Sequence, residues 1–242
     1  MKNIHTFPHS DELIKALADK ICVIAGEAIE LQNRFNFVLS GGSSPRRLYE
    51  LLASESYRNK INWDKTRFFF GDERFVPADD KERNSLMVQE SLFEPLQIPE
   101  SHIFKVDTTG SPEEAAKNYA KTISDQFEKK PIVFDFILLG LGDDAHTASL
   151  FPHTPVIQES EATVRSVFIE KLATYRITMT APLINQAKQI AFLVYGKGKA
   201  MAVKQVIAGK TGSSADFPAR LIDREKAEWY LDAEAASQLQ QN

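Results

Sequence analysis

The sequence predicts an α/β protein in which helices flank a mainly parallel sheet. Two observations support this class. Short apolar segments alternate with amphipathic ones along the chain, as strands alternate with helices in such folds. Residues 132–139 form an almost unbroken apolar run, which is typical of a central parallel strand that helices cover on both faces. The 242 residues show no internal repeat and no linker, so a single domain over residues 1–242 is expected.

The clearest individual elements lie in the first half of the chain. Ser10 precedes two acidic residues, and apolar residues then recur at helical spacing, which predicts a helix from Ser10. Residues 35–39 form an apolar strand that leads into a glycine-rich turn, and Pro45 suits the first turn of the following helix. A strand is also expected over 66–70, and helices over 84–93 and 111–129.

The second half repeats this alternation less regularly. Strand-like segments follow the central run at residues 164–169, 176–180 and 190–195. A helix is expected through Ala200 and Ile207, with Gly209 placed to end it. After the aromatic stretch 229–231, a terminal helix capped by Asp232 is expected.

The composition excludes several classes of protein. Twenty-nine Lys and Arg against 33 Asp and Glu, without long basic runs, argue against nucleic acid as the main partner. The single cysteine excludes an intrachain disulfide framework and a cysteine-based zinc site. No apolar run approaches the ~20 residues of a membrane span, and the first eight residues lack a signal-peptide core. A soluble, cytoplasmic protein is therefore expected.

Four polar or glycine-rich loops occupy the same position relative to the predicted strands. They are residues 40–44, 71–74, 140–146 and 196–199, and each directly follows an apolar strand. Ligands of open α/β sheets bind at the carboxyl ends of the strands. The four loops are therefore expected to form one pocket, and this convergence is stronger evidence than any single motif.

The first of these loops is suited to an oxyanion or a phosphate. It consists of Ser40, Gly41, Gly42, Ser43 and Ser44. Its glycines allow close backbone approach, and the N-terminus of the next helix adds positive potential. Arg74 and Lys199 supply cations on neighbouring loops. The alternatives are a tight turn and ordinary surface charges.

The 140–146 loop carries the candidate general base. Asp144 precedes His146 by two residues, and a carboxylate near an imidazole can orient it and stabilise its protonated form. The structural alternative is a histidine that caps the next helix. Gly140-Leu141-Gly142 is weak evidence for a dinucleotide site, because it comes late in the chain. His153 lies seven residues from His146, which is no known zinc spacing, and no serine stands in a Gly-x-Ser-x-Gly elbow.

Together these strings resemble the 6-phosphogluconolactonase family. The matching strings are Ser40–Pro45, Asp72–Pro77, Asn84-Ser85, Gly140–Pro152, Arg176–Thr180, the 196–199 loop and Trp229–Asp232. They span nearly the whole chain in the right order, and the stretch from His146 to Pro152 is highly specific. The resemblance implies a Rossmann-like sheet of the glucosamine-6-phosphate deaminase type.

The deaminases share the Ser-Gly-Gly-Ser loop but differ directly after the histidine. They have a His-Ile-Ala-Phe-Asn-Glu-Pro string there, and its Glu takes part in acid–base chemistry. Residues 147–152 of this chain contain no carboxylate, which favours a lactonase. Two departures from the family pattern are Ala145, where glycine is usual, and Ser44 in place of the commoner threonine.

The resemblance implies hydrolysis of 6-phospho-D-glucono-1,5-lactone to 6-phosphogluconate in the oxidative pentose phosphate pathway. His146, oriented by Asp144, would activate water, and the Ser40–Ser44 loop with Arg74 and Lys199 would hold the phosphate. Arg176 joins the substrate-binding residues, and whether it or loop amides stabilise the oxyanion stays open.

No metal and no organic cofactor is expected, and the expected partner is the sugar-phosphate lactone rather than nucleic acid or a membrane. A monomer or a weak homodimer is expected. Two alternatives remain. One is an isomerase-deaminase on the same scaffold, and the other is a sugar-phosphate-binding regulator that has lost catalysis.

Overall fold

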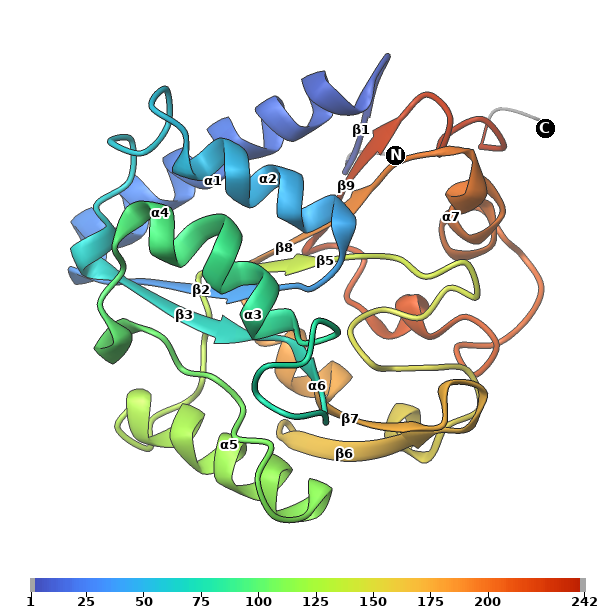
Figure 1. The fold of residues 1–242 in the computed structure, drawn as a ribbon. Helices are drawn as coiled ribbons and strands as arrows, with labels where there is room; N and C mark the ends of the chain where they lie inside the picture. Colours follow the sequence, from blue (N-terminus) through green and yellow to red (C-terminus); the bar gives the residue numbers. More distant parts are fainter. Residues whose placement is uncertain (1–2, 240–242) are drawn as a thin grey trace.

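A six-stranded parallel sheet forms the centre of the computed structural model, which describes residues 3–239 (Figure 1). Every neighbouring pair in this sheet is parallel, so the predicted fold class is confirmed. In spatial order its strands are β1 (Ile4–Phe7), β9 (Ala227–Asp232), β8 (Gln189–Val194), β5 (Phe136–Leu139), β2 (Phe35–Leu39) and β3 (Thr66–Phe70).

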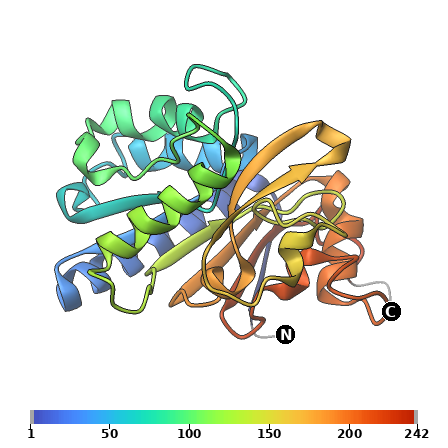
Figure 2. The ribbon, with the colours of Figure 1, turned by 90° about the horizontal axis from the view of Figure 1, so that it is seen from below.

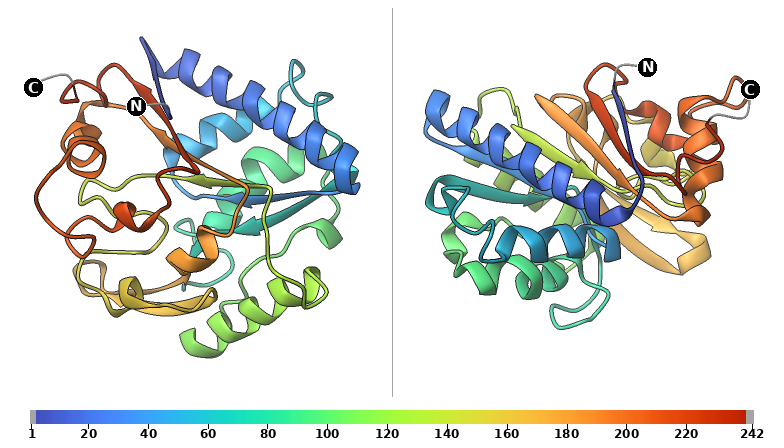
Figure 3. Two further views of the ribbon diagram at one scale, coloured as in Figure 1. Left: turned by 180° about the vertical axis from the view of Figure 1, so that it is seen from behind. Right: turned by 90° about the horizontal axis from the view of Figure 1, so that it is seen from above.

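Helices cover both faces of this sheet and enclose a separate apolar core on each. On one face lie α1 (Ser10–Gln32), α2 (Ser43–Ala53), α3 (Asn84–Val88) and α4 (Glu94–Leu96) (Figure 3). On the other lie α5 (Pro112–Gln126), α6 (Ala181–Ile184) and α7 (Ala200–Ile207). Successive strand residues point to opposite faces, so Phe37 packs in the first core and Val38 in the second.

The starts and ends of several helices follow from local sequence signals. Ser111 caps α5 with a reciprocal pair of bonds: the Glu114 N–H donates to the Ser111 hydroxyl (3.2 Å), and the Ser111 N–H donates to the Glu114 carboxylate (3.1 Å). Pro112 occupies the first turn, where its missing N–H costs nothing. The predicted helix over 84–93 is present, but it continues from α3 as a π-helical turn over Gln89–Phe93.

A second, three-stranded antiparallel sheet corrects the expected arrangement of the strands. It consists of β4 (Asp72–Arg74), β7 (Thr174–Met179) and β6 (Val164–Ile169). The sequence predicted a loop at residues 71–74, whereas β4 pairs with β7 so that Arg74 lies opposite Arg176. In Figure 2 the β6–β7 hairpin, coloured gold, stands apart from the strands of the large sheet. This sheet adds a wall beside the carboxyl ends of the parallel strands.

Other differences have local causes. The central strand is shorter than predicted, because the Asp135 carboxylate accepts hydrogen bonds from the Asn36 N–H (2.8 Å) and from the Lys188 ammonium (2.7 Å) just before β5 begins. β1 was not predicted. The expected terminal helix is wrong for residues 233–239, which form turns after the Ala235 N–H donates to the Asp232 carboxylate (2.7 Å). Its last residues, 240–242, lie outside the described part.

No helix within residues 3–239 combines the length and the apolar character that crossing a membrane would require.

Candidate active site

A cleft of about 250 Å³ lies where the carboxyl ends of β2, β5 and β8 meet the second sheet. It brings together the four residues predicted to share one pocket, Gly42, Arg74, His146 and Lys199. All of Ser40–Ser44 and Arg176 line it as well. Asp144 does not line the cleft and lies behind His146, to which it is hydrogen-bonded. Every predicted site residue is therefore in the cleft or in contact with it.

A larger cavity of about 450 Å³ lies at the edge formed by β1 and β9, away from these loops. Its arginines are already engaged with the backbone: Arg220 donates to the carbonyls of Gln205 and Gly212, and Arg224 donates to the carbonyl of Val206. The smaller cleft contains the imidazole and the glycine loop, so we place the chemistry there.

The Ser40–Ser44 loop is held by one buried tyrosine and one close side-chain contact. The Tyr49 hydroxyl accepts from the Ser40 N–H and donates to the Ser40 carbonyl, both at 2.9 Å. Gly42 precedes α2 with a φ of 106°, which is strained for other residues. A Cβ on Gly41 would lie 1.7 Å from the Asn84 amide oxygen. The loop therefore presents bare backbone at the start of α2.

The opposite wall consists of side chains from β4, β7 and α3. Arg74 and Arg176 are paired across β4 and β7, and Asn84 begins α3. The Nε atoms of both arginines and the Oδ1 atom of Asn84 are buried without a hydrogen-bond partner among the described residues. Burial lowers the pKa of Arg176, and nearby Asp72 opposes that change. Buried polar atoms without partners are costly, so this wall is suited to a polar ligand.

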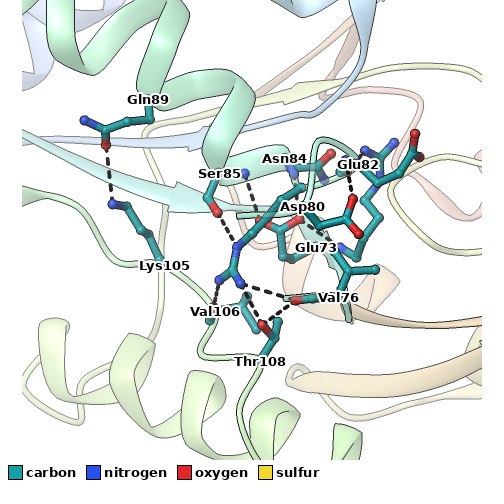
Figure 4. Close-up of polar contacts among 12 residues, drawn as sticks. Glu73, Val76, Asp80, Glu82, Asn84, Ser85, Gln89, Lys105, Val106 and Thr108 are labelled. Carbon is teal, nitrogen blue, oxygen red and sulfur yellow. Dashed lines mark hydrogen bonds and ion pairs between the residues drawn. The ribbon is translucent and has the colours of Figure 1, made fainter. Parts of the chain in front are cut away.

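A buried ion pair fixes this wall in place (Figure 4). Glu73 is fully buried, and its carboxylate accepts from the backbone N–H groups of Arg74 (2.8 Å), Asn84 (2.7 Å) and Ser85 (2.8 Å). Burial raises the pKa of the Glu73 carboxyl, and these N–H donors oppose the rise. The Arg83 guanidinium lies 3.8 Å from the same carboxylate. Glu73 thus joins β4 to the start of α3 and places Arg74 beside Asn84.

Arg83 extends the network to the segment before α5. Its guanidinium donates to the Ser85 hydroxyl (2.8 Å), the Val106 carbonyl (2.6 Å) and the Thr108 hydroxyl (2.6 Å). Figure 4 labels the residues that these contacts join, Ser85, Val106 and Thr108. The network anchors the 75–83 segment, which is flanked by two residues that line the cleft, Arg74 and Asn84.

The His146 imidazole is oriented by Asp144 and by a glycine. Its Nδ1 lies 2.5 Å from Asp144 Oδ1, which also accepts from the His146 N–H (3.2 Å). Burial raises the pKa of the Asp144 carboxyl, but hydrogen bonds from His146 and Lys171 outweigh burial and hold it below its ordinary value. A Cβ on Gly142 would lie 2.0 Å from His146 Nδ1. With Nδ1–H bound to the carboxylate, Nε2 is the nitrogen that can accept a proton.

Ala145, between Asp144 and His146 in the chain, adopts a left-handed conformation, which the glycine usual at this position would adopt easily. Its φ is 61°, and its N–H donates to the Gly142 carbonyl (3.0 Å) while its carbonyl accepts from the Ala219 N–H (3.0 Å). The alanine is therefore accommodated without displacing His146 from the cleft.

Three side chains of the site were missed as candidates. Asp72 and Asn84 line the cleft, and the Asp72 carboxylate accepts from the buried Ser149 hydroxyl (2.6 Å). Asp72 could have been found from its place directly after a strand. Lys171, which donates to the second oxygen of Asp144, has no such signal, because a turn of the β6–β7 hairpin brings it there.

Lys199 is present in the cleft but is already paired. Its ammonium donates to the Asp143 carboxylate at 2.5 Å, and the Asp143 side chain is largely exposed. The lysine can therefore exchange this partner for a ligand without leaving a buried charge.

The chain is similar to known proteins over nearly its whole length. The family model described as "Glucosamine-6-phosphate isomerases/6-phosphogluconolactonase" matches residues 8–231. A 6-phosphogluconolactonase of Nostoc sp. is 37% identical, covering 98% of both chains, and one of Haemophilus influenzae is 35% identical, covering 96% of this chain and 98% of that one. The solved 6-phosphogluconolactonase of Trypanosoma cruzi has a TM-score of 0.87 at 29% identity, with 99% of this chain and 97% of that chain covered. The chain therefore belongs to the family of glucosamine-6-phosphate isomerases and 6-phosphogluconolactonases, within which it groups with the lactonases.

Proposed function

We propose that this chain hydrolyses 6-phospho-D-glucono-1,5-lactone to 6-phosphogluconate, a step of the oxidative pentose phosphate pathway. One observation carries the proposal: an imidazole paired with a carboxylate shares a cleft with a bare glycine loop and two arginines. A base, an anion site and donors for a developing oxyanion are what lactone hydrolysis at a sugar phosphate requires.

The reaction begins with His146 in its neutral form. Nε2 removes a proton from water while the water oxygen forms a bond to C1 of the lactone, and the carbonyl electrons move to the oxygen. The tetrahedral species then collapses, the bond from C1 to the ring oxygen breaks, and His146 returns the proton to that oxygen. Asp144 holds Nδ1 throughout and stabilises the transient imidazolium.

The phosphate end is held on the glycine-loop side of the cleft. The Gly41–Ser44 backbone and the start of α2 line this side of the cleft, with Arg74 and Lys199 as cations. The Nε atoms of Arg74 and Arg176 have no hydrogen-bond partner in residues 3–239 and are donors for substrate oxygens. Phosphate binding then positions the lactone carbonyl against the activated water.

The rival on the same scaffold is an isomerase-deaminase. The family model covers both activities, but residues 147–152 provide no carboxylate after His146. Thr147 instead donates its hydroxyl to the Gly140 carbonyl (2.9 Å), which is a structural contact. The sequence and the cleft therefore favour hydrolysis.

A paired assay tests the proposal. The protein is incubated with freshly made 6-phosphogluconolactone and, separately, with glucosamine 6-phosphate. We expect acid release from the lactone well above its spontaneous opening, and no ammonia from the amino sugar. Ammonia release would establish the deaminase instead. Binding of 6-phosphogluconate with turnover of neither compound would indicate a regulator.

A further inference from the structure

We infer that Lys171, at the tip of the β6–β7 hairpin, is a positioning residue for the His146–Asp144 pair. The hairpin belongs to the second sheet, whereas the pair lies on a loop that follows the parallel sheet. The inference rests on the proposed function, because it assigns Lys171 the task of keeping the base oriented and unprotonated.

The hairpin holds Lys171 at a fixed place. β6 and β7 pair up to Ile169 opposite Thr174, and Glu170–Leu172 form a short 3₁₀ turn between them. Ala173 closes the turn with a φ of 48°, and its N–H donates to the Glu170 carbonyl (3.1 Å). The backbone that carries Lys171 is therefore tied to the second sheet on both sides.

Lys171 occupies the carboxylate oxygen that His146 leaves free. Its ammonium donates to Asp144 Oδ2, while Oδ1 accepts from His146 Nδ1 (2.5 Å) and from the His146 N–H (3.2 Å). With each oxygen held, the carboxylate cannot rotate without breaking a charge-assisted bond. The imidazole is thereby kept in the tautomer that leaves Nε2 free to accept a proton.

A second contact joins Lys171 to the imidazole through Phe151. The Lys171 ammonium lies 4.8 Å from the centre of the Phe151 ring, and that ring stacks on the His146 ring at 3.9 Å and 21°. Phe151 is buried, so its ring is fixed by the second core. The Lys171 ammonium therefore contacts both the carboxylate and the aromatic ring, and each of these contacts the His146 imidazole.

The charges in this group act on His146 in opposite directions. Asp144 alone favours the imidazolium, which cannot act as a base, and the Lys171 ammonium offsets that charge. The other charged groups around the cleft are Arg74, Arg176, Lys199, Asp143 and Asp72. None of them forms a hydrogen bond or ion pair with Lys171 among the described residues, so they stay in place when Lys171 is replaced. Removing the ammonium therefore favours the imidazolium, and the rising limb of the pH–rate profile moves to higher pH.

An ordinary surface ion pair is the competing explanation. The Lys171 side chain is 54% exposed, and exposed pairs contribute only about 0–1 kcal/mol to stability. On that explanation, replacement changes neither turnover nor the state of His146. The low stability cost also means that variants at this position fold.

The test compares Lys171→Met, Lys171→Arg and a matched control, Lys121→Met. Lys121 is an exposed lysine on α5 that pairs with Asp125 at 2.5 Å, away from the cleft. For Lys171→Met we expect kcat to fall about 3–30-fold, less than the loss of the base itself. KM stays within about twofold, because Lys171 does not line the cleft. Lys171→Arg restores most of kcat, and Lys121→Met behaves as wild type.

A measurement without substrate separates this inference from the proposed function. The His146 ring signals are followed by NMR against pH in the wild type and in Lys171→Met. We expect the imidazolium form to persist to higher pH in the variant. Unchanged ring titration together with unchanged kcat overturns the inference. If the wild type hydrolyses no lactone, the proposed function fails, and the ring titration still decides whether Lys171 controls His146.

Discussion

The two walls of the cleft are built in different ways. On the parallel-sheet wall, the backbone shapes the cleft. Gly42 has a φ of 106°, which favours glycine, and a Cβ on Gly142 would lie 2.0 Å from the imidazole. On the antiparallel wall, buried side chains shape the cleft. Arg74, Asn84 and Arg176 each carry a buried polar atom without a hydrogen-bond partner among the described residues. The candidate base, His146, lies on the first wall.

This difference suggests a division of labour. The parallel-sheet wall orients His146 through Asp144 and Gly142, so damage at these residues changes the rate of the chemical step. The antiparallel wall presents cations held by the Glu73–Arg83 pair, so damage there changes the binding of the substrate. Substitutions on each wall test whether kcat falls for the parallel-sheet wall and KM rises for the antiparallel wall.

The largest effect is expected from His146→Ala. Removal of the general base lowers kcat about 10²–10⁴-fold, while binding of 6-phosphogluconate is kept, because the anion contacts lie on other loops. Turnover is measured against the spontaneous opening of the lactone, and the rising limb of the pH–rate profile is lost. Near-normal turnover with the same limb would make His146 a structural residue.

On the antiparallel wall, Arg74→Glu is expected to weaken 6-phosphogluconate about 10–100-fold, as loss of a charge-assisted bond of about 1.5–3 kcal/mol implies. Calorimetric titration gives the affinity, and the melting temperature shows that folding is kept. Arg58→Glu is the control, because Arg58 is exposed and does not line the cleft. Equal affinities for the two variants would remove Arg74 from the binding site.

A smaller effect is expected at Gly142 of the parallel-sheet wall, and Gly198, which does not line the cleft, serves for comparison. In Gly142→Ala the new methyl would meet His146 Nδ1 at 2.0 Å, so we expect about a tenfold loss of kcat through displacement of the imidazole. Gly198→Ala is the control, because nothing lies within 4 Å of a Cβ there. If both variants kept full kcat, the position of the imidazole would not depend on Gly142.

The smallest effect concerns acid stability. Because the Asp144 carboxyl has its pKa held below the ordinary value, it stabilises the fold above the unfolded pKa of about 3.9. That contribution is lost as the pH falls through the folded pKa. Urea unfolding of wild type and Asp144→Asn should therefore differ most near neutrality and converge in acid. If the difference in unfolding free energy between wild type and Asp144→Asn stayed constant with pH, the Asp144 charge would contribute nothing to stability.

The sequence predicted the parallel-sheet wall because its signals are local. The 40–44 and 140–146 loops follow their strands directly, so strand, loop and helix could be assigned from consecutive residues. The antiparallel wall depends on the pairing of Asp72 with Thr178, which are distant in sequence. No local pattern specifies that register, and Arg74 was expected on a loop rather than on a strand.

The same limit applies to the residues that act through others. Asn84 stood in a matching string but had no assigned role, because its position against Gly41 depends on the buried Glu73 carboxylate. Lys171 was not considered at all, since only the turn after β6 brings it to Asp144.

The place of β1 in the sheet has a consequence for the order in which the protein folds during its synthesis. β1 pairs with β9 alone, and about 220 residues separate Phe7 from the start of β9. A ribosome that adds 5–20 residues per second needs roughly 10–45 s to span that interval. Throughout that time the backbone groups at Ile4–Phe7 lack their native partner strand. The edge of the large sheet is thus one of the last parts to close, after the loops that form both walls of the cleft have been made.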